Sequence, residues 1–195
     1  MKNIVAFSSF FALSLVLLGC GKRVDPSVEN IAIEYTKASY DYDWGKMATL
    51  LVSENLRNFK NANIAVLSRQ DSISLALDHH VQHDTILDYT RNQATQALPP
   101  DSFFAGVMNV AAPSARMRAT SSYLAPTIVY LGAVNEGDDT MQVILRVRVI
   151  KRGLLLTDAK LLSMKRDKEG WRVMLPESVV TMATSYLQVH GIARR

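Results

Sequence analysis

The sequence predicts a single α+β domain in which N-terminal helices pack on an antiparallel sheet of about four strands, with a C-terminal helix after the sheet. Apolar residues recur at helical spacing through the first part of the chain. From about residue 127 onwards they alternate with polar residues at period two. Short turn sequences join the alternating segments, which is typical of an antiparallel meander rather than a parallel sheet.

The composition sets limits on the domain and its partners. The 195 residues are 48% hydrophobic and 21% charged, as expected for one packed globular domain. The formal net charge of +4 is spread along the chain without a basic block beside aromatic residues, so we predict no nucleic-acid partner. The single cysteine excludes an intramolecular disulfide, so the fold must depend on packing.

The first residues have the layout of a secretory signal peptide. Lys2 supplies a positive charge, and an apolar run broken only by serines extends from Ile4 to Leu18. With 15 residues, this run is shorter than the roughly 20 residues that a membrane-spanning helix needs. We therefore predict export with cleavage rather than a permanent transmembrane anchor.

The run ends in Leu17-Leu18-Gly19-Cys20, which resembles the lipobox of bacterial lipoproteins. The resemblance implies that residues 1–19 are removed, that Cys20 is lipidated and that residues 20–25 form a short tether. Several acyl chains on one residue would hold the protein firmly at a membrane. The alternative is a chance cysteine after an ordinary signal peptide. Gly21 stands where the family's inner-membrane retention signal is an aspartate. For a two-membrane bacterium this implies the outer membrane, with the domain facing the periplasm.

Two helices are predicted next, packed as a hairpin. Asp25-Pro26 is a typical helix start, with an N-cap aspartate and proline at the first helical position. The apolar face that follows consists of Val28, Ile31, Tyr35, Ala38 and Tyr42. Asp43 is the expected cap of a second helix that runs to about Leu56. The apolar face of this second helix consists of Trp44, Met47, Ala48 and Leu51.

A third helix is predicted from about Ser68 to Ala97, before Pro99-Pro100. Three polar residues, His80, Asp84 and Arg91, interrupt its apolar seam. If the seam lines a pocket, burial would shift the pKa values of these groups, and we take them as candidate ligand-binding residues. The alternative is an amphipathic helix whose seam is exposed to solvent.

Motifs for metal binding and catalysis are weak in this chain. His79 and His83 have the i, i+4 spacing of helical metal ligands, but His80 stands where a zincin motif needs a glutamate. We therefore expect a solvated polar face and no metal site. The sequence has no Gly-x-Ser-x-Gly elbow and no glycine-rich phosphate loop, so no catalytic residue is assigned and no cofactor is expected.

The sheet is predicted in the last third of the chain, after a short helix at Asp101 to Ala112 and a loop to Pro126. The expected strands cover residues 127–134, 141–149, 154–166 and 171–175, with turns at 151–153 and 167–170. A final helix from Pro176 to about Val189 would complete one domain over residues 26–190.

Two pairs of arginines are candidate partner contacts, because arginine is enriched at interfaces. Arg146 and Arg148 alternate with aliphatic residues on the second strand, and Arg116 and Arg118 flank a methionine in the preceding loop. A solvated sheet face explains the strand arginines equally well.

Two segments resemble the NTF2-like, cystatin-like superfamily: Asp43-Trp44 at the junction of the first helices, and the closing hairpin from Met164 to Val173 with its Gly170-Trp171. The resemblance implies that helices wrap a strongly curved antiparallel sheet to form a cone with an internal pocket. It implies no activity, because this superfamily contains enzymes, binders and assembly proteins.

The leading hypothesis is a non-enzymatic, lipid-anchored periplasmic domain that binds an envelope protein or another envelope component. The alternative is a pocket that binds a small apolar ligand or catalyses an isomerase-like reaction. A deep cavity lined by Trp44, Tyr35 and strand residues would favour the pocket, whereas a filled core with an exposed apolar groove would favour the interaction module.

The first prediction concerns the anchor. Cys20→Ser should abolish lipidation and leave unprocessed or soluble protein, because the sequence offers no other acylation site or spanning helix. Metabolic labelling with a fatty-acid analogue measures this. Label retained by the variant would contradict the lipobox interpretation.

Overall fold

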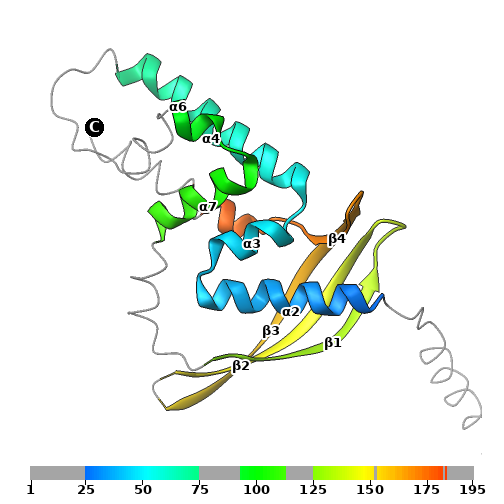
Figure 1. The fold of residues 1–195 in the computed structure, drawn as a ribbon. Helices are drawn as coiled ribbons and strands as arrows, with labels where there is room; N and C mark the ends of the chain where they lie inside the picture. The colour runs from blue at the N-terminus through cyan, green and yellow to red at the C-terminus, as the bar shows by residue number, and fades with distance from the viewer. Residues whose placement is uncertain (1–24, 75–92, 113–124, 152, 182, 184–195) are drawn as a thin grey trace, which may run out of the picture.

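The computed structural model describes residues 25–74, 93–112, 125–151, 153–181 and 183. It confirms the α+β class: helices precede a four-stranded antiparallel sheet, and a short helix follows it (Figure 1). Within the described part of the chain, no helix is both long and apolar enough to cross a membrane.

The first two helices begin at the predicted aspartate caps. Helix α2 spans Pro26–Asp41, and the Asp25 carboxylate accepts a hydrogen bond from the Ser27 backbone N–H at 2.9 Å. Helix α3 spans Trp44–Leu50, and the Asp43 carboxylate accepts from the Lys46 N–H at the same distance. Each carboxylate thus satisfies a backbone donor that the helix leaves open.

Helix α3 ends at Leu50, six residues before its predicted end, and α4 starts at Ser53 and runs to Ser74. The reason is a tertiary contact. Leu51 forms a parallel bridge with Val173, and the Val52 N–H donates to the Val173 carbonyl at 3.0 Å. Helical spacing of apolar residues cannot reveal this break, because the two residues between the helices are themselves buried.

The predicted third helix is only partly within the described residues. Its first residues form the end of α4, and its last residues form α6, Gln93–Ala97. Helix α7, Pro100–Ala111, matches the next predicted helix and packs against α3 and α4. Phe104 lies edge-on to Phe59 of α4, with ring centroids 5.3 Å apart. These contacts join α3, α4 and α7 into one helical layer (Figure 1).

The sheet has the order β1-β2-β3-β4, each neighbour antiparallel. The strands are β1 Thr127–Asn135, β2 Thr140–Lys151, β3 Leu154–Asp167 and β4 Gly170–Val173. The predicted strands and turns are therefore correct to within two residues. The register of β1 shifts between Tyr130 and Gly132, a bulge that bends the edge strand. After Pro176 a short helix covers residues 177–181.

Alternate residues of β2 form the buried side of the sheet: Met141, Val143, Leu145, Val147 and Val149. We call this side the inner face. Helix α2 lies across it and contacts β1, β2 and β4 (Figure 1). The core therefore lies between this face, α2 and the helical layer.

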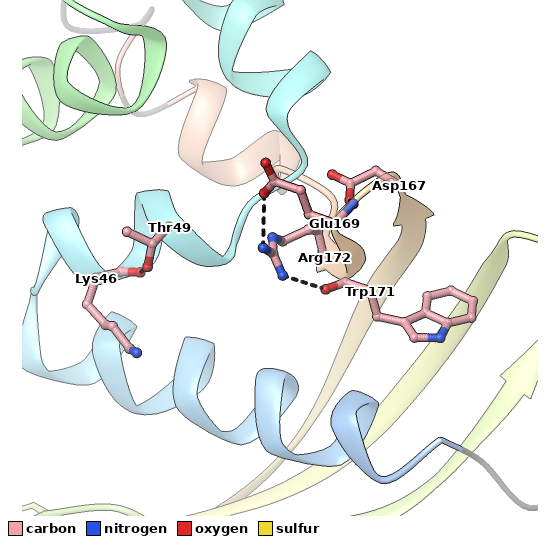
Figure 2. Close-up of polar contacts among 6 residues, drawn as sticks. All are labelled: Lys46, Thr49, Asp167, Glu169, Trp171 and Arg172. Atoms are coloured by element: carbon pink, nitrogen blue, oxygen red, sulfur yellow. Dashed lines mark hydrogen bonds and ion pairs between the residues drawn. The ribbon is translucent and has the colours of Figure 1, made fainter.

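The turn between β3 and β4 is stabilised by its own charges (Figure 2). The Glu169 N–H donates to the Asp167 carboxylate at 2.9 Å. The Arg172 guanidinium donates to the Glu169 carboxylate and to the Trp171 carbonyl, both at 3.2 Å. Gly170 has a φ of 112°, which other residues rarely adopt. The polar groups of this turn are thus used in closing the hairpin.

The sheet register predicts unequal costs for neighbouring substitutions on β2. Leu145→Ala should lower the free energy of unfolding by roughly 2–5 kcal/mol, because Leu145 is fully buried. Arg148→Ala should change it by less than about 0.5 kcal/mol, because Arg148 is exposed. Urea titration of both variants measures the difference. Equal costs would show that the two faces have been assigned wrongly.

Candidate functional site

Of the residues proposed from sequence as functional, Arg146 and Arg148 lie within the described part of the structure, whereas the lipidation site, the seam residues and the loop arginines lie outside it. Cys20 precedes its first described residue, and His80, Asp84 and Arg91 fall in the gap between α4 and α6. Arg116 and Arg118 fall in the gap between α7 and β1. Their predicted roles therefore stay predictions. Among the described residues, no group of three or more histidine, cysteine, aspartate or glutamate side chains could hold a metal ion.

The side of the sheet opposite α2 is the strongest candidate for a functional surface. Paired strand residues point to the same side, so the β2–β3 register identifies the side chains on this side. We call the following set the outer sheet patch: Val129, Val134, Ile144, Arg146, Arg148, Ile150, Leu155, Thr157, Ala159 and Leu161. The same register places Thr127, Gln142, Ser163 and Lys165 on this side as well, outside the patch, and Gln142 donates to the Glu136 carboxylate. Several aliphatic side chains of the patch are exposed; Leu161, for example, is 64% exposed.

The charged groups of the outer sheet patch are both cations. Arg146 and Arg148 lie two residues apart on β2, and the patch contains no carboxylate. The Nε atom of Arg146 is buried and has no hydrogen-bond partner among the described residues. On β3, Asp158 pairs with Val147 and so belongs to the inner face. The patch is therefore apolar and positively charged.

The end of the β2–β3 hairpin has exposed aliphatic side chains on both sides, with Lys151 beside Leu154 on the inner side. Ile150 and Leu155 are paired and lie in the outer sheet patch, whereas Leu154 and Leu156 point to the inner side. We call these four residues the hairpin tip; their exposed fractions are 40% for Ile150, 68% for Leu154, 64% for Leu155 and 46% for Leu156. Isolated exposed leucines are ordinary, but a continuous exposed cluster marks an interaction site.

The hairpin tip and the start of α2 lie at opposite ends of the sheet (Figure 1). Arg166, close to β4, contributes to lowering the Asp25 pKa, after the hydrogen bonds from Ser27, which places Asp25 near that end. The β2–β3 register puts Thr140 beside Lys165 at the same end and Lys151 beside Leu154 at the other. Twelve residues of β2 separate the two ends, about 40 Å of extended chain.

Titratable side chains flank α2 on the inner face. Tyr130, Leu145 and Lys160 form one row across three strands. The Lys160 ammonium lies 4.6 Å from the centroid of the Tyr40 ring, and burial lowers the Lys160 pKa, an effect partly opposed by Asp158. Burial, and secondarily the charge of Glu29, raises the Tyr130 pKa.

This row does not assign an acid–base reaction. The Tyr130 hydroxyl is buried and has no hydrogen-bond partner in the described part of the chain, so no described base orients it. The Lys160 ammonium lies over the Tyr40 ring, an arrangement that stabilises a buried ammonium. The described residues thus form a packed interior in which a few side chains end in polar groups. These described polar groups are not arranged around a common point as catalytic groups would be.

Trp44 and Tyr35, the two aromatic residues considered as a cavity lining, are part of the core cluster. The indole N–H of Trp44 donates to the Ala112 carbonyl at 2.9 Å, which fixes the ring between α3 and the end of α7. Burial raises the pKa of the Tyr35 phenol. Both rings therefore contribute to packing.

The sequence contains a signal for the exposed hairpin tip that differs from the alternation of apolar and polar residues. Leu154, Leu155 and Leu156 are consecutive, so they cannot all face the core of a two-sided strand. Three apolar residues directly after a turn therefore predict that at least one is exposed. The arginines of β2 were identified from sequence, although the choice between a solvated face and a partner surface was left open.

Comparison with known proteins adds no relative: no family model, no curated protein and no solved structure matches the chain.

Burial of Tyr35 predicts a loss of stability at alkaline pH. Its folded-state pKa is raised above the usual value of about 10, so the stability that the buried neutral phenol contributes is fully present below pH 10 and is lost as the pH rises beyond it. Tyr35→Phe should therefore lose less stability than the wild type above pH 10. Urea unfolding across this range measures the difference. An equal loss of stability above pH 10 in the wild type and in Tyr35→Phe would contradict the role assigned to the buried Tyr35 phenol.

Proposed function

We propose that this chain is a lipid-anchored lipoprotein of the cell envelope that acts as a non-enzymatic interaction module. The exposed apolar hairpin tip, continuous with the outer sheet patch, is the observation that carries the proposal. Burying a leucine or isoleucine side chain contributes about 1.5–3 kcal/mol relative to leaving it exposed. Four such side chains at one end of the sheet would therefore contribute substantially to association with a partner.

The anchoring part of the proposal rests on the sequence before the first described residue. A charged start, an apolar run and the lipobox-like Leu17 to Cys20 support export and lipidation. The outer membrane, with the domain facing the periplasm, is the proposed location because Gly21 follows Cys20. Since α2 begins at Pro26, the tether from Cys20 to Asp25 reaches at most about 17 Å.

The observed order of helices followed by an antiparallel sheet is compatible with the NTF2-like, cystatin-like resemblance, which stays part of the proposal. A ligand pocket of that type is the second hypothesis. The packing of Trp44 and Tyr35 in the core favours the interaction module over it. The proposed pocket residues His80, Asp84 and Arg91 have no described positions, so they do not alter this preference.

Site-specific photocrosslinking in cells tests the proposal. A photoreactive amino acid at Leu155 of the full chain should give adducts with an envelope component, protein or lipid, because this side chain is exposed in the hairpin tip. The matched control is the exposed Asn109 of α7, in the helical layer, which should give few.

The crosslinking result is combined with a functional measurement. Leu154→Ser with Leu155→Ser should impair complementation of a deletion strain without changing the amount of protein, because both side chains are exposed in the fold. Equal adducts at positions 155 and 109, or full complementation by the double variant, would contradict the proposed docking surface.

A further inference from the structure

We infer that the outer sheet patch and the hairpin tip dock on a phospholipid surface that carries anionic headgroups. The inference deepens the proposed function, because it names the envelope component that the module contacts. It rests on the described sheet and on the proposed attachment near Asp25.

The hairpin tip has exposed aliphatic side chains on both sides. A flat protein surface would cover one side of a two-stranded hairpin, either Ile150 and Leu155 or Leu154 and Leu156. The other pair would stay in water. A lipid interface surrounds whatever enters it, so shallow insertion removes all four side chains from water together.

The positive charge of the outer sheet patch also favours a phospholipid surface. Arg146 and Arg148 lie among aliphatic side chains, and the patch contains no carboxylate. A guanidinium group pairs well with phosphate oxygens, and the long arginine side chain allows its charge to stay at headgroup level while neighbouring aliphatic groups lie deeper.

The same charges argue against a second copy of the chain as the occupant. A symmetric pairing of two outer sheet patches would bring four guanidinium groups together without a carboxylate among the patch residues. Like charges at an interface oppose association. An acidic phosphate surface supplies the missing negative charge.

The position of the proposed tether relative to the hairpin tip also favours a membrane surface. The tether would attach at one end of the sheet and the hairpin tip projects from the other (Figure 1). A domain standing upright would hold the tip about 40 Å from the bilayer. Lying along the membrane, the domain brings both ends to the same surface. Because α2 covers the inner face, the side that meets the lipid is the outer sheet patch.

Fluorescence quenching by brominated lipid tests the inference on the full chain extracted from cells. Leu155→Trp is incorporated into vesicles of equal parts phosphatidylcholine and phosphatidylglycerol, with some of the phosphatidylcholine brominated. Its emission should shift to the blue and be quenched. Asn109→Trp is the matched control and should stay unquenched, and the parent protein gives the background of the buried Trp44 and Trp171.

A charge variant tests the anionic component. Adding Arg146→Gln and Arg148→Gln to Leu155→Trp should reduce the ratio of docked to undocked protein by about 25-fold, because each arginine near an anionic surface contributes about five-fold. Arg57→Gln, an exposed residue of α4, is the control and should have no effect. Vesicles of phosphatidylcholine alone should show weak quenching that the charge variant does not change.

Each result decides the inference. It is overturned if position 155 is unquenched in anionic vesicles, if position 109 is quenched equally, or if the arginine variant docks like the parent. It is also overturned if quenching at position 155 disappears when an envelope protein extract is added, because a protein then occupies the patch. Circular dichroism confirms that each variant is folded.

The mass of the same purified protein shows whether Cys20 carries lipid. An unlipidated Cys20 would refute the proposed anchor, yet the quenching measured on that sample still decides the contact between sheet and lipid. The failure of the anchor and the failure of the inference are thus distinguishable.

Discussion

The sheet has two faces and the described helices cover one of them, and the rest of the described structure depends on this constraint. Alternation along β2 sends Val143 and Leu145 into the core and Arg146 and Arg148 to the opposite side. Helix α2 covers the inner face, so the core forms between the helices and this face without the outer face. A partner could therefore cover the outer face without a cost to folding.

A second constraint joins the helical layer to the sheet. Leu51 and Val52 pair with Val173 of the four-residue strand β4, so the break between α3 and α4 is fixed by a partner more than 100 residues away. The sequence predicted the aspartate caps and the strand limits, because capping and period-two alternation are local signals. It placed the end of the second helix wrongly, because the bridge to Val173 is not local.

The candidate surface was predictable to a similar extent. Alternation identified Arg146 and Arg148 as sharing a face opposite the buried aliphatic residues, and the turn at Gly153 was expected. Periodicity says which residues share a face, but not how far a covering helix extends along the strand. Leu156 shares the inner face with the buried Val149 and is still exposed, because it lies at the end of the hairpin that projects beyond α2.

An exposed apolar sheet face carries a risk of self-association, and the structure limits this risk in two ways. The arginines of the outer sheet patch repel a second copy face to face, and the bulge between Tyr130 and Gly132 bends the β1 edge away from regular pairing. Neither the arginines nor the bulge opposes contact with an anionic lipid surface. Lipid phosphates pair with arginines, and a lipid surface has no strand that would need a regular sheet edge. The arginines that keep copies of the chain apart would thus also favour docking on an anionic membrane surface.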